Sequence, residues 1–282
     1  MFVEKPLARP VKLPDETRLV VLISVDFEGH WDFGYHTDTL PDYYDFYEHH
    51  FDGRRGIWRL LEVLAKHQVN ATFFTCGAAL EEHREACQEI EKAGYEIAGH
   101  SYRHEYFYRI TAEQEETAFQ QMVAAFQDFY GKELIGFRTC HPEPPRTLDT
   151  VVRHGLRYDS SLRDDDLPYI LQREEDGRYL VEIARGANGD AAMMGTPLAT
   201  EWGSGKYGIP SDVASHWEAE FHRCYQEGAN KIEVFSLCLH SYISGRPSRA
   251  KALDSFLAYT RQFPGVWYAT YAEIADLWLK AI

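Results

Sequence analysis

Short apolar runs alternate with helical patterns from one end of the 282-residue chain to the other. Residues 19–25 (LVVLISV) form an uninterrupted, β-branched run, which is typical of a strand buried on both faces. Residues 57–66 then carry apolar side chains at helical spacing. Alternation of this kind predicts a parallel sheet covered by helices. A barrel and a doubly wound sheet both satisfy it, and in either fold active residues gather where strands end and loops begin.

The other elements are expected from the same patterns and from turn and cap signals. Strands are expected at residues 71–75, 95–98, 135–138, 180–183, 232–239 and 266–270. Helices are expected at residues 81–93, 111–130, 148–154, 212–226, 248–262 and 272–282. Thr111 and Gln114 have capping-box spacing at the start of the longest helix. Because no low-complexity linker or repeat interrupts the pattern, we expect one domain over residues 1–282, with an N-terminal arm at 1–18.

Composition excludes several classes of partner. The formal net charge is −15 and the pI is about 5.3, so the phosphates of nucleic acids and anionic membranes would be repelled. The chain has no run of about 18 apolar residues for a transmembrane helix and no signal-peptide-like apolar run at its N-terminus. The five cysteines are an odd number without a CxxC pair, which argues against a disulfide framework or a cysteine zinc site. We therefore expect a cytoplasmic protein that binds neither nucleic acid nor membrane.

The stretch at residues 29–55 is too long for a plain connection and is crowded with aromatic side chains. As a lid or substrate wall beside the active end it would make Trp31 and Tyr35 substrate-binding residues, and a subunit contact is the other interpretation. Asp165, in the acidic run at 164–166, is a further candidate that could hydrogen-bond a compact polar ligand; a solvated surface acid is the alternative. A loop so placed predicts a small substrate rather than a long polymer in an open groove.

Two carboxylates follow the first buried strand. Asp26 and Glu28 are two residues apart on extended chain, so their side chains point the same way. Two carboxylates directed together are costly unless a cation or a proton is shared between them. For this pair alone, an ordinary role in a strand-to-loop turn is the other interpretation.

Histidines and an arginine follow other predicted strands. His100 and His104 are four residues apart, which on a helix would place both imidazoles on one face, as suits two ligands of one metal ion. With Glu28 they would form a three-ligand site that leaves positions open for water and substrate. Arg138 ends another strand, where a cation could stabilise a carboxylate. His240 ends the apolar run FSLCLH and could equally be an ordinary core histidine.

Taken in order, these residues resemble the motifs of the polysaccharide deacetylase family, carbohydrate esterase family four. That family has an acidic pair after the first strand, an H-[ST]-x-x-H motif, an R-x-P-like turn, an aspartate motif and an L-x-L-H motif. The corresponding segments here are Asp26-Phe27-Glu28, His100-Ser101-Tyr102-Arg103-His104, Arg138, Asp159 in YDSSL, and Leu237-Cys238-Leu239-His240. The resemblance covers residues 19–280, nearly the whole chain.

The resemblance implies a deformed (β/α) barrel and a divalent metal ion, with zinc expected. It assigns these roles: metal ligands Glu28, His100 and His104; a general base, Asp26, oriented by Arg138; a general acid, His240; and a further catalytic residue, Asp159. The metal would polarise an amide carbonyl and lower the pKa of a water. The base would then deprotonate that water and the acid would protonate the departing nitrogen.

Two departures from the family pattern leave the substrate open. Many members have adjacent aspartates, whereas Phe27 separates the two acids here. Arg138 is followed by Thr139-Cys140-His141-Pro142 instead of an R-x-P turn. Other segments, such as GRPSR at 245–249, resemble an intracellular branch that includes peptidoglycan-deacetylase-like proteins and cyclic-amide hydrolases of the allantoinase and imidase kind. Some cyclic-amide members lack metal ligands, but this chain keeps both histidines, which favours a metal enzyme.

From these features we expect a metal-dependent hydrolase that removes the N-acetyl group of a sugar or sugar conjugate, assembled as a homo-oligomer like its branch relatives. Ring opening of a cyclic amide or imide is the alternative function. A non-catalytic, metal-stabilised binding protein is a third possibility. The presence of both Asp26 and His240 argues against it, because binding alone needs neither.

Overall fold

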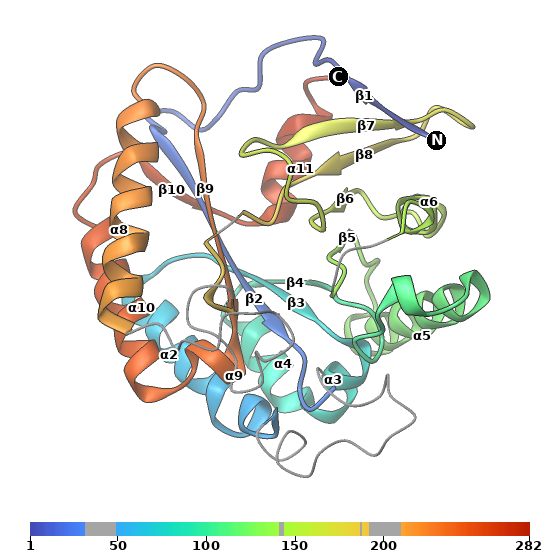
Figure 1. Ribbon diagram of the computed structural model, residues 1–282, viewed down its shortest axis with the longest axis horizontal. Coiled ribbons are helices and arrows are strands. Elements are labelled where there is room, and N and C mark those ends of the chain that lie inside the picture. Colours follow the sequence, from blue (N-terminus) through green and yellow to red (C-terminus); the bar gives the residue numbers. More distant parts are fainter. Residues whose placement is uncertain (32–48, 141–143, 187, 192–209) are drawn as a thin grey trace.

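A sheet of ten strands is the frame of the part of the chain that the computed structural model describes, residues 1–31, 49–140, 144–186, 188–191 and 210–282 (Figure 1). Its strands are β1 Phe2–Lys5, β2 Leu19–Phe27, β3 Thr72–Thr75, β4 Glu96–Gly99, β5 Gly136–Phe137, β6 Tyr158–Asp159, β7 Tyr169–Arg173, β8 Tyr179–Glu182, β9 Val234–His240 and β10 Val266–Ala269. The helices are α2 Ile57–His67, α3 Gly77–Glu82, α4 Arg84–Lys92, α5 Ala112–Tyr130, α6 Arg146–Arg153, α8 Pro210–Glu227, α9 Ser241–Ser244, α10 Pro247–Thr260 and α11 Tyr271–Leu279.

The strand β2 is central because it pairs along both of its edges. On one edge β9 lies parallel to it from Val20 to Asp26. On the other edge β10 pairs with its first half and β3 with its second half, also in parallel. The sheet continues from β3 through β4, β5 and β6 to β8, and β7 and β1 extend it as antiparallel strands. A strand with three partners splits the sheet, so the architecture is a deformed (β/α) barrel.

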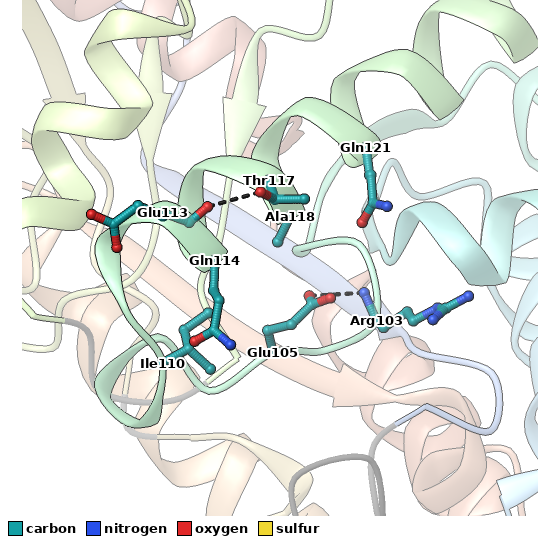
Figure 2. A pocket seen from close by; sticks show the side chains of 8 residues that line it. All are labelled: Arg103, Glu105, Ile110, Glu113, Gln114, Thr117, Ala118 and Gln121. Carbon is teal, nitrogen blue, oxygen red and sulfur yellow. Dashed lines mark hydrogen bonds between the residues drawn. The ribbon is translucent and has the colours of Figure 1, made fainter.

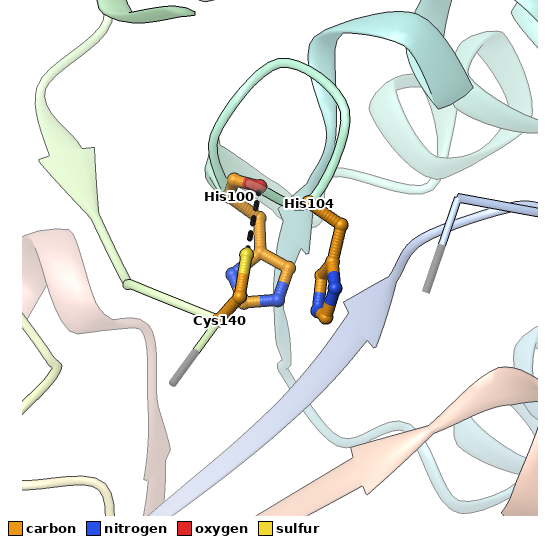
Figure 3. A group of neighbouring side chains, drawn as sticks. All are labelled: His100, His104 and Cys140. Carbon is orange, nitrogen blue, oxygen red and sulfur yellow. Dashed lines mark hydrogen bonds between the residues drawn. The ribbon is translucent and has the colours of Figure 1, made fainter. Parts of the chain in front are cut away.

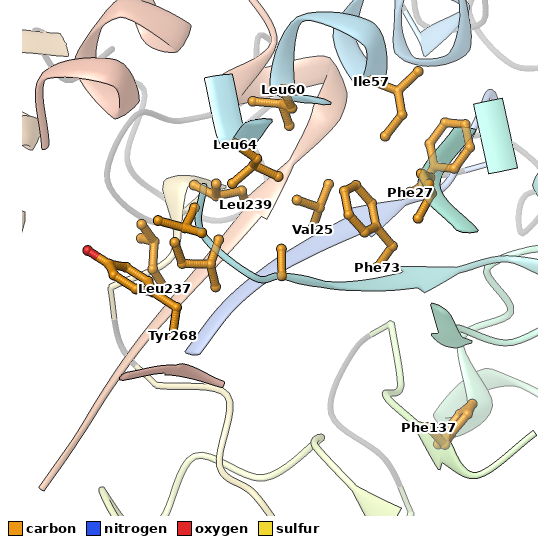
Figure 4. Packing of buried hydrophobic residues seen from close by; sticks show 14 of the residues in the cluster. Val25, Phe27, Ile57, Leu60, Leu64, Phe73, Phe137, Leu237, Leu239 and Tyr268 are labelled. Atoms are coloured by element: carbon orange, nitrogen blue, oxygen red, sulfur yellow. The ribbon is translucent and has the colours of Figure 1, made fainter. Parts of the chain in front are cut away.

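Side chains of β2 alternate between the two faces of the sheet, as strand geometry requires. Its odd-numbered residues belong to the larger apolar cluster, which Leu60 and Leu64 of α2 cover (Figure 4). Its even-numbered residues face the other way: Val20 and Leu22 belong to a second apolar cluster, and Asp26 continues their row. The alternation therefore directs Asp26 away from the covering helices and into the barrel.

Most predicted elements are present, and the differences have local causes. The predicted helix at 81–93 is two helices, α3 and α4, which meet at His83, where the ring packs on Phe27 with centroids 5.6 Å apart. The predicted N-terminal arm contains β1, which covers the edge of β7, a strand that the sequence pattern does not predict. An uncovered edge would expose unpaired amides and carbonyls. No helix in the described ranges is long and apolar enough to cross a membrane.

Candidate active site

The candidate catalytic and metal-binding residues gather at the carboxyl ends of parallel strands. These are Asp26 and Glu28 at the end of β2, His100 and His104 after β4, Arg138 after β5, Asp159 at the end of β6 and His240 at the end of β9. Each is at most 7% exposed. Asp26 and His240 are register partners in the β2–β9 pair. Strand pairing thus brings together residues that are more than two hundred positions apart in the chain.

His100 and His104 lie on a tight turn, and not on the helix that their four-residue spacing would suit. Ser101 and His104 have left-handed backbone conformations, with φ of 64° and 58°, which are uncommon outside glycine. The Glu105 carboxylate stabilises the turn by accepting hydrogen bonds at 3.1 and 2.8 Å from the two amides that follow Ser101. Such backbone strain persists only where surrounding contacts over-determine it. The turn brings the two imidazole centroids to 5.2 Å.

Glu28 faces both of these imidazoles. Its Oε1 lies 3.5 Å from Nε2 of His100 and 3.2 Å from Nε2 of His104. His100 Nδ1 lies 2.8 Å from the backbone carbonyl oxygen of Arg138. Because a carbonyl oxygen can only accept, this Nδ1 carries the proton and Nε2 has a lone pair directed at Glu28.

The donor set fits a divalent metal ion. Glu28 Oε2 and His100 Nε2 are buried and have no hydrogen-bond partner among the described residues. Leaving such atoms unpaired in the interior costs free energy, which an ion between them would offset. Two imidazoles and a carboxylate form a common set of zinc ligands. The structure therefore brings Glu28, His100 and His104 together as the sequence predicts, in an arrangement that could hold a metal.

Asp26 forms a buried ion pair with Arg138, whose Nη1 donates to Asp26 Oδ1 at 2.7 Å. Both side chains are fully buried. Burial alone would raise the pKa of the Asp26 carboxyl, but Arg138, with His100 and His240, outweighs it and holds that pKa below its ordinary value. Asp26 is thus an ionised carboxylate in a buried site, and a general base must be ionised to accept a proton.

Arg138 is held on all sides. Its Nη1 also donates to the Ser24 hydroxyl at 2.8 Å, and its Nη2 donates to the hydroxyls of Ser160 and Tyr271, each at 3.0 Å. The guanidinium carbon lies 3.8 Å from the centroid of the Phe74 ring, a cation–π contact. The arginine cannot turn away from Asp26 without breaking several bonds. The predicted orienting role of Arg138 agrees with this geometry.

His240 is held by a residue that the sequence interpretation missed. Asp190 is fully buried, its Oδ1 lies 2.7 Å from His240 Nδ1, and its Oδ2 accepts from the His240 amide at 2.8 Å. Burial would lower the pKa of His240, but Asp190 and Glu28 outweigh it and raise that pKa well above its ordinary value. The other ring nitrogen, Nε2, lies 3.8 Å from Asp26 Oδ2 and 3.6 Å from Glu28 Oε1. This geometry suits an imidazolium that donates a proton into the site.

Asp159 does not take part in this arrangement. Its carboxylate accepts from the amide and the hydroxyl of Ser161 at 2.9 and 2.8 Å, and none of the contacts that the structure gives it is with His240. Burial raises its pKa. Ser161 in turn accepts from the Thr139 amide at 2.9 Å, so Asp159 supports the loop that carries Arg138. The aspartate that lies beside His240 is Asp190. The aspartate motif of the family pattern is the sequence signal that could have indicated it.

Asp52 is a second buried acid that the sequence interpretation missed. Its Oδ2 accepts from the amides of Glu28 and Gly29 at 3.2 and 2.8 Å, and its Oδ1 accepts from the Ser241 hydroxyl. These bonds tie the end of β2 to the residue after His240. Burial is the main cause that raises the pKa of Asp52 to about 7. Its sequence context, the loop-end segment FDGRR, carries no strand-end signal.

Three residues were predicted to contact the substrate: Trp31, Tyr35 and Asp165. Trp31 is buried, with its ring stacked on His30 at a centroid distance of 4.5 Å and Arg103 over its face at 4.9 Å. Tyr35 lies outside the described residues. Asp165 is exposed and accepts from the Leu167 amide at 2.9 Å, as a turn residue does. The solvated interpretation of Asp165 therefore agrees with its local contacts.

A cavity of about 410 Å³ lies between α5 and the segment that follows His104 (Figure 2). Arg103 and Glu105, the chain neighbours of His104, form part of its wall, and side chains of α5 such as Gln114 and Thr117 form the rest. None of the candidate catalytic or metal-binding residues lines it among the described residues. The cavity therefore lies behind the histidine turn and not at the site itself.

Comparison with known proteins shows the fold and a similarity to one family. Residues 42–158 match the model of the polysaccharide deacetylase family, a range that includes both histidines and Arg138. This part of the chain is similar to a polysaccharide deacetylase domain. The peptidoglycan deacetylase of Helicobacter pylori is 27% identical over 281 residues, which cover 92% of this chain and 94% of that protein. A putative polysaccharide deacetylase of Schizosaccharomyces pombe is 25% identical and covers 81% of this chain and 74% of its own length.

Solved structures confirm the deformed barrel of the polysaccharide deacetylase type. A putative polysaccharide deacetylase from Mycobacterium smegmatis superposes with a TM-score of 0.82 at 26% identity, over 97% of this chain and 94% of that one. PuuE allantoinase superposes with a TM-score of 0.84 at 21% identity, over 95% and 92% of the two chains, a likeness of fold. The deacetylases to which the chain is similar are hydrolases of the deacetylase and amidohydrolase type, which act on carbon–nitrogen bonds other than peptide bonds.

Proposed function

We propose that the chain is a metal-dependent hydrolase that removes the acetyl group from an N-acetylated sugar or sugar conjugate. The observation that carries this proposal is the placement of an ionised base and a cationic acid beside one ligand set. Asp26 Oδ2 and Glu28 Oε1 lie 3.8 and 3.6 Å from His240 Nε2. The similarity to a peptidoglycan deacetylase over nearly the whole chain supports the sugar amide as substrate class.

Glu28, His100 and His104 would hold the metal. When bound, the ion would polarise the acetyl carbonyl and make a water molecule more acidic. Asp26 accepts the proton of that water as the water oxygen bonds to the carbonyl carbon. His240 gives its Nε2 proton to the amide nitrogen as the carbon–nitrogen bond breaks, so that acetate and a free amine leave. Arg138 and Asp190 keep the base and the acid in these orientations.

Ring opening of a cyclic amide is the second candidate function, because the same base and acid would serve it. The fold likeness to PuuE allantoinase favours it, but an identity of 21% speaks for the fold alone, and the identity to a peptidoglycan deacetylase is higher, 27%. A non-catalytic, metal-stabilised binding protein is the weakest candidate. A buried arginine that orients Asp26 and a buried aspartate that orients His240 have no use in simple binding.

Metal content and rate test the proposal together. Wild-type protein, His100→Ala and His104→Ala are purified, metal is quantified in each, and hydrolysis is followed on N-acetylglucosamine oligomers, allantoin and a hydantoin. We expect about one zinc per wild-type chain, its loss in both variants, and turnover of the acetylated sugar. Equal metal content in all three proteins would remove the metal site, and turnover of the cyclic amides alone would replace the substrate class.

A further inference from the structure

Cys140 lies against the histidine turn although no role has been assigned to it. It stands two residues after Arg138, at the place where the chain departs from the R-x-P pattern. Its side chain is 7% exposed, and its thiol donates to the backbone oxygen of His100 at 3.7 Å. Figure 3 shows the sulfur beside the His100 ring, with the His104 ring facing them from the other end of the turn.

The three side chains have the spacing of a metal site. One ligand atom each from His100, His104 and Cys140 lies within 4.8 Å of the other two, and all three residues are buried. His100 Nε2 is buried and has no hydrogen-bond partner among the described residues. We propose that Cys140 is a thiolate ligand of the metal that His100 and His104 hold. This inference rests on the metal dependence proposed above.

A thiolate changes what the site can do. With Glu28 it makes four protein ligands, and four protein ligands are typical of a closed zinc site, whereas a catalytic site keeps one position for water. Cys140 would therefore help to hold the ion in the resting protein, and Asp26 and His240 would keep their roles as base and acid. On metal binding the thiol releases its proton to solvent. A soft sulfur ligand also favours zinc over magnesium or manganese.

Cys76 provides a matched control. Its thiol also donates to the His100 backbone oxygen, at 3.1 Å, and it is fully buried. Its sulfur belongs neither to the group of His100, His104 and Cys140 nor to the other candidate ligand group among the described residues, which is Asp26, Glu28 and His240. Cys76→Ser thus removes a thiol from the same carbonyl without removing a proposed ligand.

The test is zinc-edge X-ray absorption of zinc-loaded wild type, Cys140→Ser and Cys76→Ser. We expect a zinc–sulfur shell at about 2.3 Å in wild type and in Cys76→Ser, and only nitrogen and oxygen neighbours in Cys140→Ser. Cobalt-substituted protein should show a thiolate charge-transfer band that the Cys140 variant alone loses. Zinc affinity, measured by competition with a chelator, should fall at least about tenfold in Cys140→Ser and hold in Cys76→Ser.

The outcomes separate this inference from the proposed function. Zinc bound in wild type with no sulfur neighbour overturns the role of Cys140 and leaves the metal enzyme standing. If the sulfur shell is lost in Cys76→Ser and kept in Cys140→Ser, the ligand is Cys76, and this result also overturns the inference. Wild type that binds no zinc overturns both. The wild-type spectrum decides the first and last cases, even where a variant does not fold.

Discussion

Asp190 holds His240 by its ring and by its backbone at once. Oδ1 lies 2.7 Å from Nδ1, and Oδ2 accepts from the His240 amide at 2.8 Å. The same Oδ2 accepts from the Ser244 hydroxyl at 2.6 Å, so α9 is tied to the pair. With Nδ1 engaged, only Nε2 can donate into the site, toward Asp26 and Glu28.

Asp190→Asn should lower the rate of amide hydrolysis on the order of 10²- to 10⁴-fold, because a neutral amide no longer stabilises the imidazolium. The loss should be much smaller on an activated ester, whose leaving group needs no proton. Ser244→Ala removes another bond to the same carboxylate and serves as the control, with a rate within about tenfold of wild type. Equal losses on amide and ester would assign Asp190 to structure and not to the acid.

Asp26→Asn should keep the metal and lose on the order of 10²–10⁴ in rate. Asparagine has nearly the same shape, and its oxygen can still accept from Arg138 at the 2.7 Å contact. What it lacks is the ability to take a proton. The comparison needs kcat and metal content on the same preparation. Loss of metal along with activity would make Asp26 a ligand and overturn its role as base.

Arg138→Met should destabilise the protein by about 3–5 kcal/mol, because it leaves Asp26 as a buried carboxylate without its partner. Urea unfolding of both proteins at one pH measures the difference. Arg157→Met breaks an exposed pair, Arg157 with Asp276 at 2.6 Å, and should cost at most about 1 kcal/mol. Comparable losses of unfolding free energy in the two variants would show that the buried pair contributes no more to stability than the exposed pair.

Glu96→Gln should change how stability depends on pH. Thr72 and Tyr158 hydroxyls donate to the carboxyl at 2.7 Å each, and the Ala272 amide donates at 3.0 Å. Burial is the largest cause and raises the pKa of Glu96 above its ordinary value of 4.5. The folded protein therefore binds this proton more tightly than the unfolded chain does. Its contribution to stability is greatest at or below pH 4.5 and declines as pH rises toward the folded-state pKa.

The measurement for Glu96 is the free energy of unfolding of wild type and Glu96→Gln across a pH series from about 4.5 to 8. Glutamine keeps an acceptor for the hydroxyls but does not ionise in this range. Wild type should lose stability relative to the variant as pH increases. Parallel curves would mean that Glu96 has the same pKa folded and unfolded.

The local sequence pattern was enough to predict where strands end and which polar side chains lie at those ends. The apolar run at 19–25 predicts a buried strand, and its alternation predicts that Asp26 and Glu28 point the same way. Arg138 and His240 end two other predicted strands. Because the strands are parallel, their carboxyl ends lie on the same side of the sheet, which brings both residues to the site. The two histidines do lie together, but on a turn and not on the helix that their four-residue spacing suits.

What the sequence determined by itself is therefore the alternation of strands and helices and the residues that end the strands, since period and chain order encode them. The deformed barrel was expected only from the resemblance of its motifs to a known family. Only the tertiary structure decided that Asp190 and not Asp159 lies beside His240, that Asp52 ties the end of β2 to the start of α9, and that Cys140 reaches the histidine turn. Asp52 begins the short helix Asp52–Gly56, Asp190 is in helical conformation and Cys140 lies in a bend. None of the three belongs to an apolar run whose period predicts the direction of its side chain. Their partners are distant in sequence, and burial in a folded barrel is what pairs them.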